Sequence, residues 1–155
     1  MNNNLIITIG REYGTGGREI GQKLALRLGV PFYDRELITR AAKKTGFDEK
    51  LFEQLDKRAT NSFLYSLTMF GSVGLNGMSL TDQLYLAQSN IIREMAEDSS
   101  CVIVGRCADH VLRDFPNKFD FFIHGSIEDR VKRVQTCGDY VIEGKTPEAA
   151  LEKMD

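Results

Sequence analysis

Cysteine is scarce in this chain, and none of its apolar runs is long. The three cysteines (Cys101, Cys107 and Cys137) form no Cys-X-X-Cys pair. An odd number of cysteines without a secretory leader is typical of proteins from a reducing compartment. The first residues, MNNNLIITIG, do not resemble a signal peptide. No apolar segment approaches the roughly 20 residues of a membrane-spanning helix. We therefore expect a cytoplasmic protein without a membrane partner.

Neither sign of charge is in large excess. Lys and Arg number 20 and Asp and Glu number 22, which gives a net charge of −2. This balance does not support broad electrostatic binding to nucleic acid or to anionic membranes. The length of 155 residues suffices for one domain with a sizeable core, and 42% hydrophobic residues is ordinary for a globular protein. We expect a single domain over residues 1–155 with no nucleic-acid partner.

Short β-branched or aromatic runs alternate with helical patterns along the chain. The patterns predict strands at 5–9, 30–34, 101–105 and 119–125. They predict helices at 18–28, 35–45, 81–98 and 146–154, and another capped by Ser126 with Asp129 three residues later. Such alternation favours an α/β fold, in which helices cover both faces of a parallel sheet.

A glycine-rich segment, GREYGTGGRE at 10–19, separates the first predicted strand from the first helix. Gly14, Gly16 and Gly17 would let the backbone approach a ligand closely and direct its N–H groups at phosphate oxygens. The positive end of the following helix would add to the attraction. We interpret the segment as a phosphate-binding loop, and the alternative is a tight turn that binds nothing.

The segment departs from the standard phosphate-binding loop, GxxxxGK followed by Ser or Thr. Aligning Gly16 with the last glycine of that pattern puts Arg11 at the first glycine and Gly17 at the lysine. No hydroxyl residue stands where a ligand to Mg²⁺ is expected. Arg18 could reach the phosphates in place of the lysine, with Arg11 as a second candidate, because arginine binds phosphate bidentately. Alternatively, Arg18 lies solvated on the helix surface.

Polar residues also follow the second and third predicted strands. In parallel sheets, ligands bind beyond the carboxyl ends of the strands. Asp34 follows the second strand, where it could instead cap the next helix. Arg106 follows the third strand directly, and we predict that it is functional.

Four segments in the same order resemble the cytidylate kinase-like family of P-loop nucleoside monophosphate kinases: ITIGREYGTGGREIG, FYDRELI, CVIVGRCADHVL and FFIHGSIEDRVKRV. The resemblance implies a three-layer α/β/α fold and Mg²⁺-dependent phosphoryl transfer from ATP to CMP or dCMP. It covers nearly the whole chain, least well an acceptor-side insertion at 47–80. The residues that it implies for binding ATP phosphates are Gly14, Thr15, Gly16, Gly17, Arg18 and Glu19.

The resemblance also implies acceptor and catalytic residues. Asp34 matches an acceptor-site aspartate, and Arg106 matches the arginine of a Gly-Arg-Asp segment whose aspartate is here Cys107. Asp109 is the candidate substitute for that aspartate. Arg130 and Arg133 match arginines before the lid, so we predict that they act in catalysis together with Arg18. We predict no metal site made by the protein's own side chains.

Three further expectations concern the end of the chain, its edge strand and its activity. Relatives continue through a lid, a helix and a fifth strand, with a sheet order that resembles 2-3-1-4-5, so residues 134–155 look like an incomplete lid. The strand at 119–124 would then be an apolar edge, which predicts self-association. The missing lysine leaves two alternative functions: a non-catalytic nucleotide-binding or regulatory module, and a kinase for another small acceptor.

Overall fold

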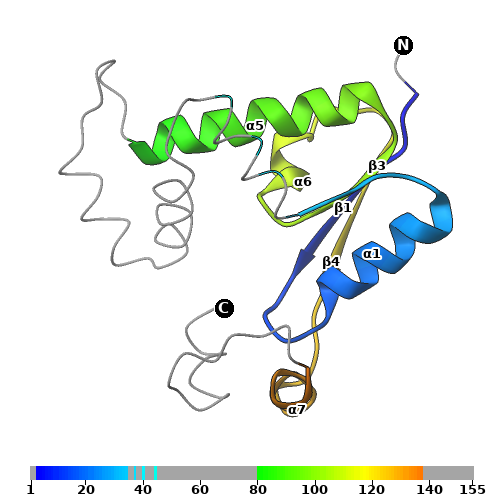
Figure 1. The fold of residues 1–155 in the computed structure, drawn as a ribbon, viewed down its shortest axis with the longest axis vertical. Helices are drawn as coiled ribbons and strands as arrows, with labels where there is room; N and C mark the ends of the chain where they lie inside the picture. Colours follow the sequence, from blue (N-terminus) through cyan, green and yellow to red (C-terminus); the bar gives the residue numbers. More distant parts are fainter. Residues whose placement is uncertain (1–2, 35–36, 38–39, 41–43, 45–79, 138–155) are drawn as a thin grey trace.

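The computed structural model of the protein describes residues 3–34, 37, 40, 44 and 80–137 (Figure 1). Most of the helix predicted at 35–45 lies outside these residues. The insertion predicted at 47–80 also lies outside them, except for residue 80. Of the incomplete lid predicted at 134–155, only residues 134–137 are described, and the helix predicted at 146–154 lies outside. The account below concerns the described part of the chain.

Four parallel strands form one sheet in the order β2-β3-β1-β4. The strands are β1 (Ile6–Arg11), β2 (Phe32–Tyr33), β3 (Cys101–Val104) and β4 (Lys118–Ile123). The helices are α1 (Gly17–Leu28), α5 (Leu80–Asp98), α6 (Ala108–Val111) and α7 (Ile127–Thr136). The predicted α/β fold with a parallel sheet is confirmed. None of the described helices is long and apolar enough to cross a membrane.

Two hydrophobic cores lie on opposite faces of the sheet. Because side chains alternate along a strand, Ile6 of β1 packs with α5 and α6, whereas Ile7 and Ile9 pack with α1. Figure 1 shows α1 on one side of the strands and α5 with α6 on the other. The sheet is therefore the middle of three layers, and all strands end at the same edge.

The helix α1 approaches the sheet through small residues. A Cβ at Gly21 would lie 2.6 Å from Cγ2 of Val104 and 3.0 Å from Cε2 of Phe32. Helical periodicity over 18–28 places Ile20, Leu24, Ala25 and Leu28 on one face, but Ile20 and Leu28 are both 44% exposed, so this prediction is wrong at these two positions. The buried residues of α1 are Gly17, Gly21 and Ala25, and Leu24 packs partly buried against the same core.

The helix α7 begins as predicted. The hydroxyl of Ser126 accepts a hydrogen bond from the N–H of Asp129 at 3.1 Å and donates one to its carboxylate at 2.9 Å. This cap satisfies one of the N–H groups that lack a partner at a helix start. The cap fixes where α7 starts after β4, and with it the position of the arginines on that helix.

A polar cluster joins β1 to β4. Thr8 is 2% exposed and donates a hydrogen bond to the Asp120 carboxylate at 2.5 Å. The Lys118 ammonium contacts the same carboxylate and donates to the carbonyl oxygen of Asp109 at 2.9 Å. Burial by itself would raise the pKa of Asp120, but the hydrogen bonds from Lys118 and Thr8 outweigh it and lower the pKa below its ordinary value of 3.8.

We expect Asp120→Asn to destabilise the protein at pH 7 by roughly 1 kcal/mol, the size of a charge-assisted hydrogen bond at a partly exposed site. A carboxyl whose pKa is lowered by folding stabilises the protein above its unfolded pKa and loses that contribution as pH falls through the folded pKa. Urea unfolding at pH 7 and pH 3 should therefore show a larger loss of stability in the wild type than in the variant. Equal losses would contradict this role for Asp120.

The strand β4 is at an edge of the described sheet and carries large exposed apolar side chains. Phe119, Phe121 and Phe122 are 53%, 51% and 64% exposed. An unpaired strand edge with apolar side chains favours pairing with a second chain. Self-association through residues 119–124 remains a prediction.

Sedimentation at concentrations on the order of tens of micromolar, where exposed strand edges begin to associate, should show a dimer or larger species. Phe121→Lys should shift it to the monomer, because a charged residue on an edge strand opposes pairing. Ile127→Lys is the matched control, since Ile127 is 64% exposed but lies on α7. A monomeric wild-type protein would contradict the prediction.

Candidate functional site

The glycine loop lies between β1 and α1, at the edge of the sheet where the strands end. Gly14 and Gly16 have φ angles of 84° and 77°, in the left-handed region that favours glycine. Within the loop, the Thr15 hydroxyl donates a hydrogen bond to the Glu12 carbonyl at 2.8 Å, and the Thr15 N–H contacts the same oxygen at 3.4 Å. Gly16 stands directly before the first residue of α1, so the loop runs into the positive end of that helix.

Arg130 of α7 is buried and contacts the residues that precede the glycines of the loop. Its side chain is 5% exposed, and its Nε donates a hydrogen bond to the Tyr13 carbonyl at 2.7 Å. The same guanidinium lies 3.4 Å from the Glu12 carboxylate. That carboxylate also accepts the N–H of Gly125 at 3.1 Å. Arg130 was predicted to act in catalysis, and the structure places it inside the protein, where it connects α7 with the loop backbone.

Arg133 lies against the loop from the outside. A Cβ at Gly16 would lie 2.5 Å from Cζ and 2.7 Å from Nη2 of Arg133, so its guanidinium packs on that glycine. The guanidinium also forms an ion pair with Glu19, and the Glu19 carboxylate forms a second ion pair with Lys23 Nζ at 2.6 Å. Lys23 and, after it, Arg133 lower the pKa of the Glu19 carboxyl. Arg133 and Glu19, two predicted site residues, therefore meet beside the loop.

Arg18 and Asp34 meet across the sheet edge. The Nε of Arg18 lies 2.7 Å from the Asp34 carboxylate, and the two side chains are 51% and 13% exposed. Arg18 was predicted at the ATP phosphates and Asp34 at the acceptor. Their ion pair joins the start of α1 to the end of β2, so the two predicted subsites are adjacent.

Arg106 and Cys107 follow β3 with unusual backbone angles. Their φ values are 60° and 51°, a left-handed conformation that costs free energy in residues other than glycine. Arg106 is half-buried, whereas Asp109, the predicted substitute for the missing aspartate, is exposed. Arg106 follows β3, the strand next to β2, so it is at the same sheet edge as Asp34.

Arg11, the last residue of β1, was only a second candidate in the sequence. A Cβ at Gly17 would lie 2.6 Å from its Cβ and 2.9 Å from its Cγ. A Cβ at Gly105 would overlap its Nη1 atom. The side chain thus runs from the first residue of α1 to the end of β3. Two departures from the standard loop indicate this path in the sequence: Arg11 stands at the position of the first glycine, and Gly17 stands at the position of the lysine.

The described residues do not fit a metal ion held by the protein alone. They contain no group of three His, Cys, Asp or Glu side chains placed to hold one. The two loop carboxylates are already engaged: Glu12 contacts Arg130 and the Gly125 N–H, and Glu19 contacts Lys23 and Arg133. Mg²⁺ is commonly bound through substrate phosphates and water with few protein ligands.

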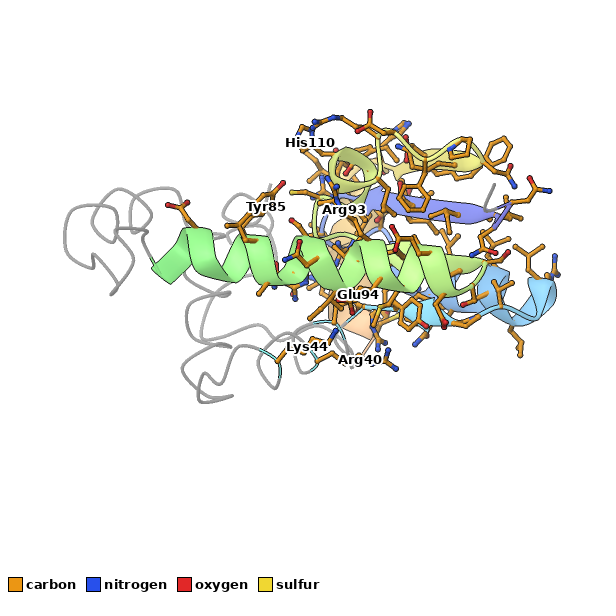
Figure 2. The ribbon with its side chains drawn as sticks, turned by 90° about the horizontal axis from the view of Figure 1, so that it is seen from above. Arg40, Lys44, Tyr85, Arg93, Glu94 and His110 are labelled. Atoms are coloured by element: carbon orange, nitrogen blue, oxygen red, sulfur yellow. The ribbon has the colours of Figure 1, made fainter. Side chains whose placement is uncertain are left out.

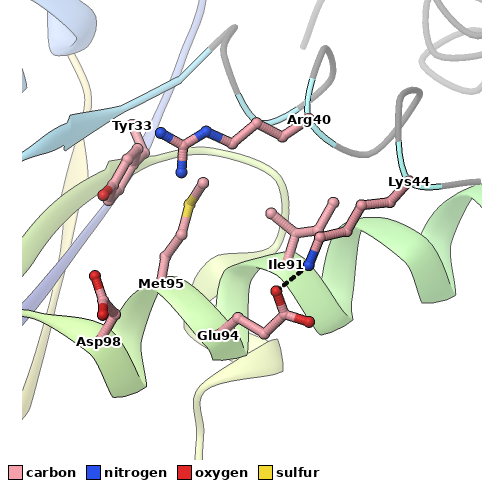
Figure 3. A pocket seen from close by; sticks show the side chains of 7 residues that line it. All are labelled: Tyr33, Arg40, Lys44, Ile91, Glu94, Met95 and Asp98. Carbon is pink, nitrogen blue, oxygen red and sulfur yellow. Dashed lines mark hydrogen bonds and ion pairs between the residues drawn. The ribbon is translucent and has the colours of Figure 1, made fainter.

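A cavity of about 450 Å³ lies away from the loop, beside α5 (Figure 3). Two cations of its lining have partners there: Lys44 pairs with Glu94, and the Arg40 guanidinium lies 5.6 Å from the centre of the Tyr33 ring. Figure 2 shows Glu94 on the side of α5 nearer Arg40 and Lys44, and Tyr85 and Arg93 on the side nearer His110. None of the predicted site residues lines this cavity, whose lining is Tyr33, Arg40, Lys44, Ile91, Glu94, Met95 and Asp98.

Arg130→Met keeps most of the side-chain volume but removes the guanidinium. We expect a loss of about 3 kcal/mol in the free energy of unfolding, because the Tyr13 carbonyl and the Glu12 carboxylate lose a buried charged partner. Urea unfolding measures this loss. Lys132→Met is the control on the same helix, since Lys132 is exposed. A loss as small as that of the control would contradict the supporting role of Arg130.

Comparison with known proteins agrees with the sequence segments that suggested a family. Residues 6–155 match the model of the cytidylate kinase-like family. A crystal structure of an uncharacterized protein from Eubacterium ventriosum is 30% identical, with a TM-score of 0.62, covering 97% of this chain and 71% of that chain. No curated protein matches the chain. With the parallel sheet and the glycine loop at its carboxyl edge, these matches show that the chain belongs to the cytidylate kinase-like family.

Proposed function

We propose that the protein is an ATP-dependent kinase of the P-loop type that phosphorylates a nucleoside monophosphate, with CMP or dCMP as acceptor. Membership of the cytidylate kinase-like family supports nucleotide kinase activity in general. The observation that carries the proposal is the loop itself. Two glycines with positive φ lead into the N-terminus of α1, and Arg18 and Arg133 lie beside it.

Phosphoryl transfer depends on positioning and charge neutralisation more than on covalent chemistry of the protein. In the proposed complex, the loop N–H groups and the N-terminus of α1 bind the ATP phosphates. Arg133, which packs on Gly16, neutralises charge from the outer side of the loop. Arg130 acts as a positioning residue, because its contacts with Tyr13 and Glu12 hold the loop backbone.

The acceptor would bind next to the loop, at the ends of β2 and β3. Asp34 and Arg106 follow these neighbouring strands. In this arrangement, Arg106 binds the acceptor phosphate and Asp34 contacts its nucleoside part, with Asp109 nearby on α6. The Arg18–Asp34 pair connects the two subsites and would rearrange when the phosphates draw the guanidinium away from the carboxylate. A metal would accompany the ATP phosphates, and we assign it no ligand from this chain.

Two observations favour a second candidate function, a nucleotide-binding module that does not catalyse transfer. The loop has neither the lysine nor the hydroxyl of the standard pattern. The ion pair of Arg133 with Glu19 also engages one cation beside the loop with a carboxylate of the protein. A binding module and an enzyme differ in turnover, which the following experiment measures.

The full chain should transfer the labelled γ-phosphoryl group of ATP to CMP or dCMP faster than to UMP, AMP or GMP. Arg18→Ala should lower kcat by about 100-fold, the usual loss when a charge-stabilising donor is removed. Arg27→Ala is the control, because Arg27 is exposed at the far end of the same helix. ATP binding without transfer to any of these acceptors would favour the binding module.

A further inference from the structure

Arg11 passes through a space that two glycines leave open. Its Cβ and Cγ atoms lie where a side chain at Gly17 would begin, at 2.6 and 2.9 Å from an ideal Cβ there. At the other end, its guanidinium occupies the position that a side chain at Gly105 would take. Gly105 has a φ of 75°, and its N–H donates to the Ile9 carbonyl at 2.9 Å, so the backbone next to the guanidinium is fixed.

The stem of Arg11 takes the place of a missing lysine stem. In the standard loop, the first position is glycine and the residue after the last glycine is lysine. Here the first position is Arg11 and the residue after Gly16 is Gly17. Compared with the standard loop, the glycine and the cationic residue have exchanged positions. Because Arg11 Cβ lies 2.6 Å from the position that a Cβ at Gly17 would take, the cationic side chain starts close to where the lysine side chain would start.

We propose that Arg11 is a catalytic residue that neutralises the transferring phosphoryl group in place of the P-loop lysine. The proposal rests on the kinase function proposed above. The side chain runs from Gly17 at the start of α1 to Gly105 directly after β3, so it connects the proposed ATP and acceptor subsites. Gly17 lies beside its stem and Gly105 beside its guanidinium, so the side chain is confined at both ends and loses little conformational freedom when it binds phosphate.

In the step that Arg11 assists, an oxygen of the acceptor phosphate bonds to the γ-phosphorus of ATP. The bond from that phosphorus to the β–γ bridging oxygen breaks, and its electron pair stays on ADP. The guanidinium remains protonated throughout, because arginine does not titrate in proteins. Its contribution is the electrostatic stabilisation of charge on the γ-phosphoryl oxygens and the bridging oxygen.

The test compares Arg11→Gln, which keeps a polar side chain without charge, with the exchange variant R11G/G17K. The exchange restores the standard order of glycine and lysine, and Gly17 has no positive φ that would oppose lysine. Arg11→Gln should lower kcat/KM for ATP by about 100-fold. The exchange variant should recover at least about tenfold over Arg11→Gln, since its lysine supplies the lost charge. Arg27→Ala again serves as the control.

A loss smaller than about tenfold in Arg11→Gln, a range ordinary for peripheral contacts, would overturn the role of Arg11 while the kinase function stands. If the wild type transfers no phosphoryl group, the kinase function fails, and calorimetric binding of ATP decides about Arg11. If Arg11→Gln then binds ATP at least about tenfold more weakly than the wild type, the proposal that Arg11 binds phosphate stands. Unchanged binding, or no ATP binding by the wild type, would overturn it.

Discussion

The buried guanidinium of Arg130 connects the glycine loop to α7, and the geometry of the site depends on it. It donates to the Tyr13 carbonyl and lies beside Glu12, whose carboxylate also accepts the Gly125 N–H. An arginine in the interior requires such partners, because its charge cannot be left without compensation. These contacts tie the residues before Gly14 to the start of α7, and the loop lies between two fixed elements.

Glycine has two different tasks around this loop. At Gly14 and Gly16 it permits a left-handed backbone, and at Gly14 it also lets the loop approach the Arg130 carbonyl and the Val134 side chain. At Gly17 and Gly105 it makes room for the side chain of Arg11. The second task explains why a glycine is compatible with the position that normally carries lysine. The volume of the lysine stem is filled by another residue.

Charge at the sheet edge is organised in pairs. Arg18 with Asp34, Arg133 with Glu19, and Arg130 with Glu12 bring three arginines and three carboxylates around the N-terminus of α1. Exposed pairs of this kind contribute little to stability, because water and salt screen them. Under the proposed function, the pairs at Arg18 and Arg133 would therefore exchange their carboxylate for a phosphate at low cost, as a site that binds and releases nucleotides requires. The Arg130 pair is buried and is suited to a permanent contact.

The sequence by itself determined the alternation of strands and helices, the parallel sheet, the Ser126 cap and the position of the glycine loop. These features follow from local patterns: β-branched runs, helical periodicity, capping residues and glycines directly after a strand. Tertiary structure alone decided which arginines are buried and which groups each of them contacts. Arg130 and Arg133 are three residues apart on one helix, yet one is buried under the loop and the other lies on it. A long side chain can reach several neighbours, and which ones are near is set by packing between elements distant in sequence. For the same reason, the path of Arg11 past Gly17 to Gly105 became visible only in the folded chain.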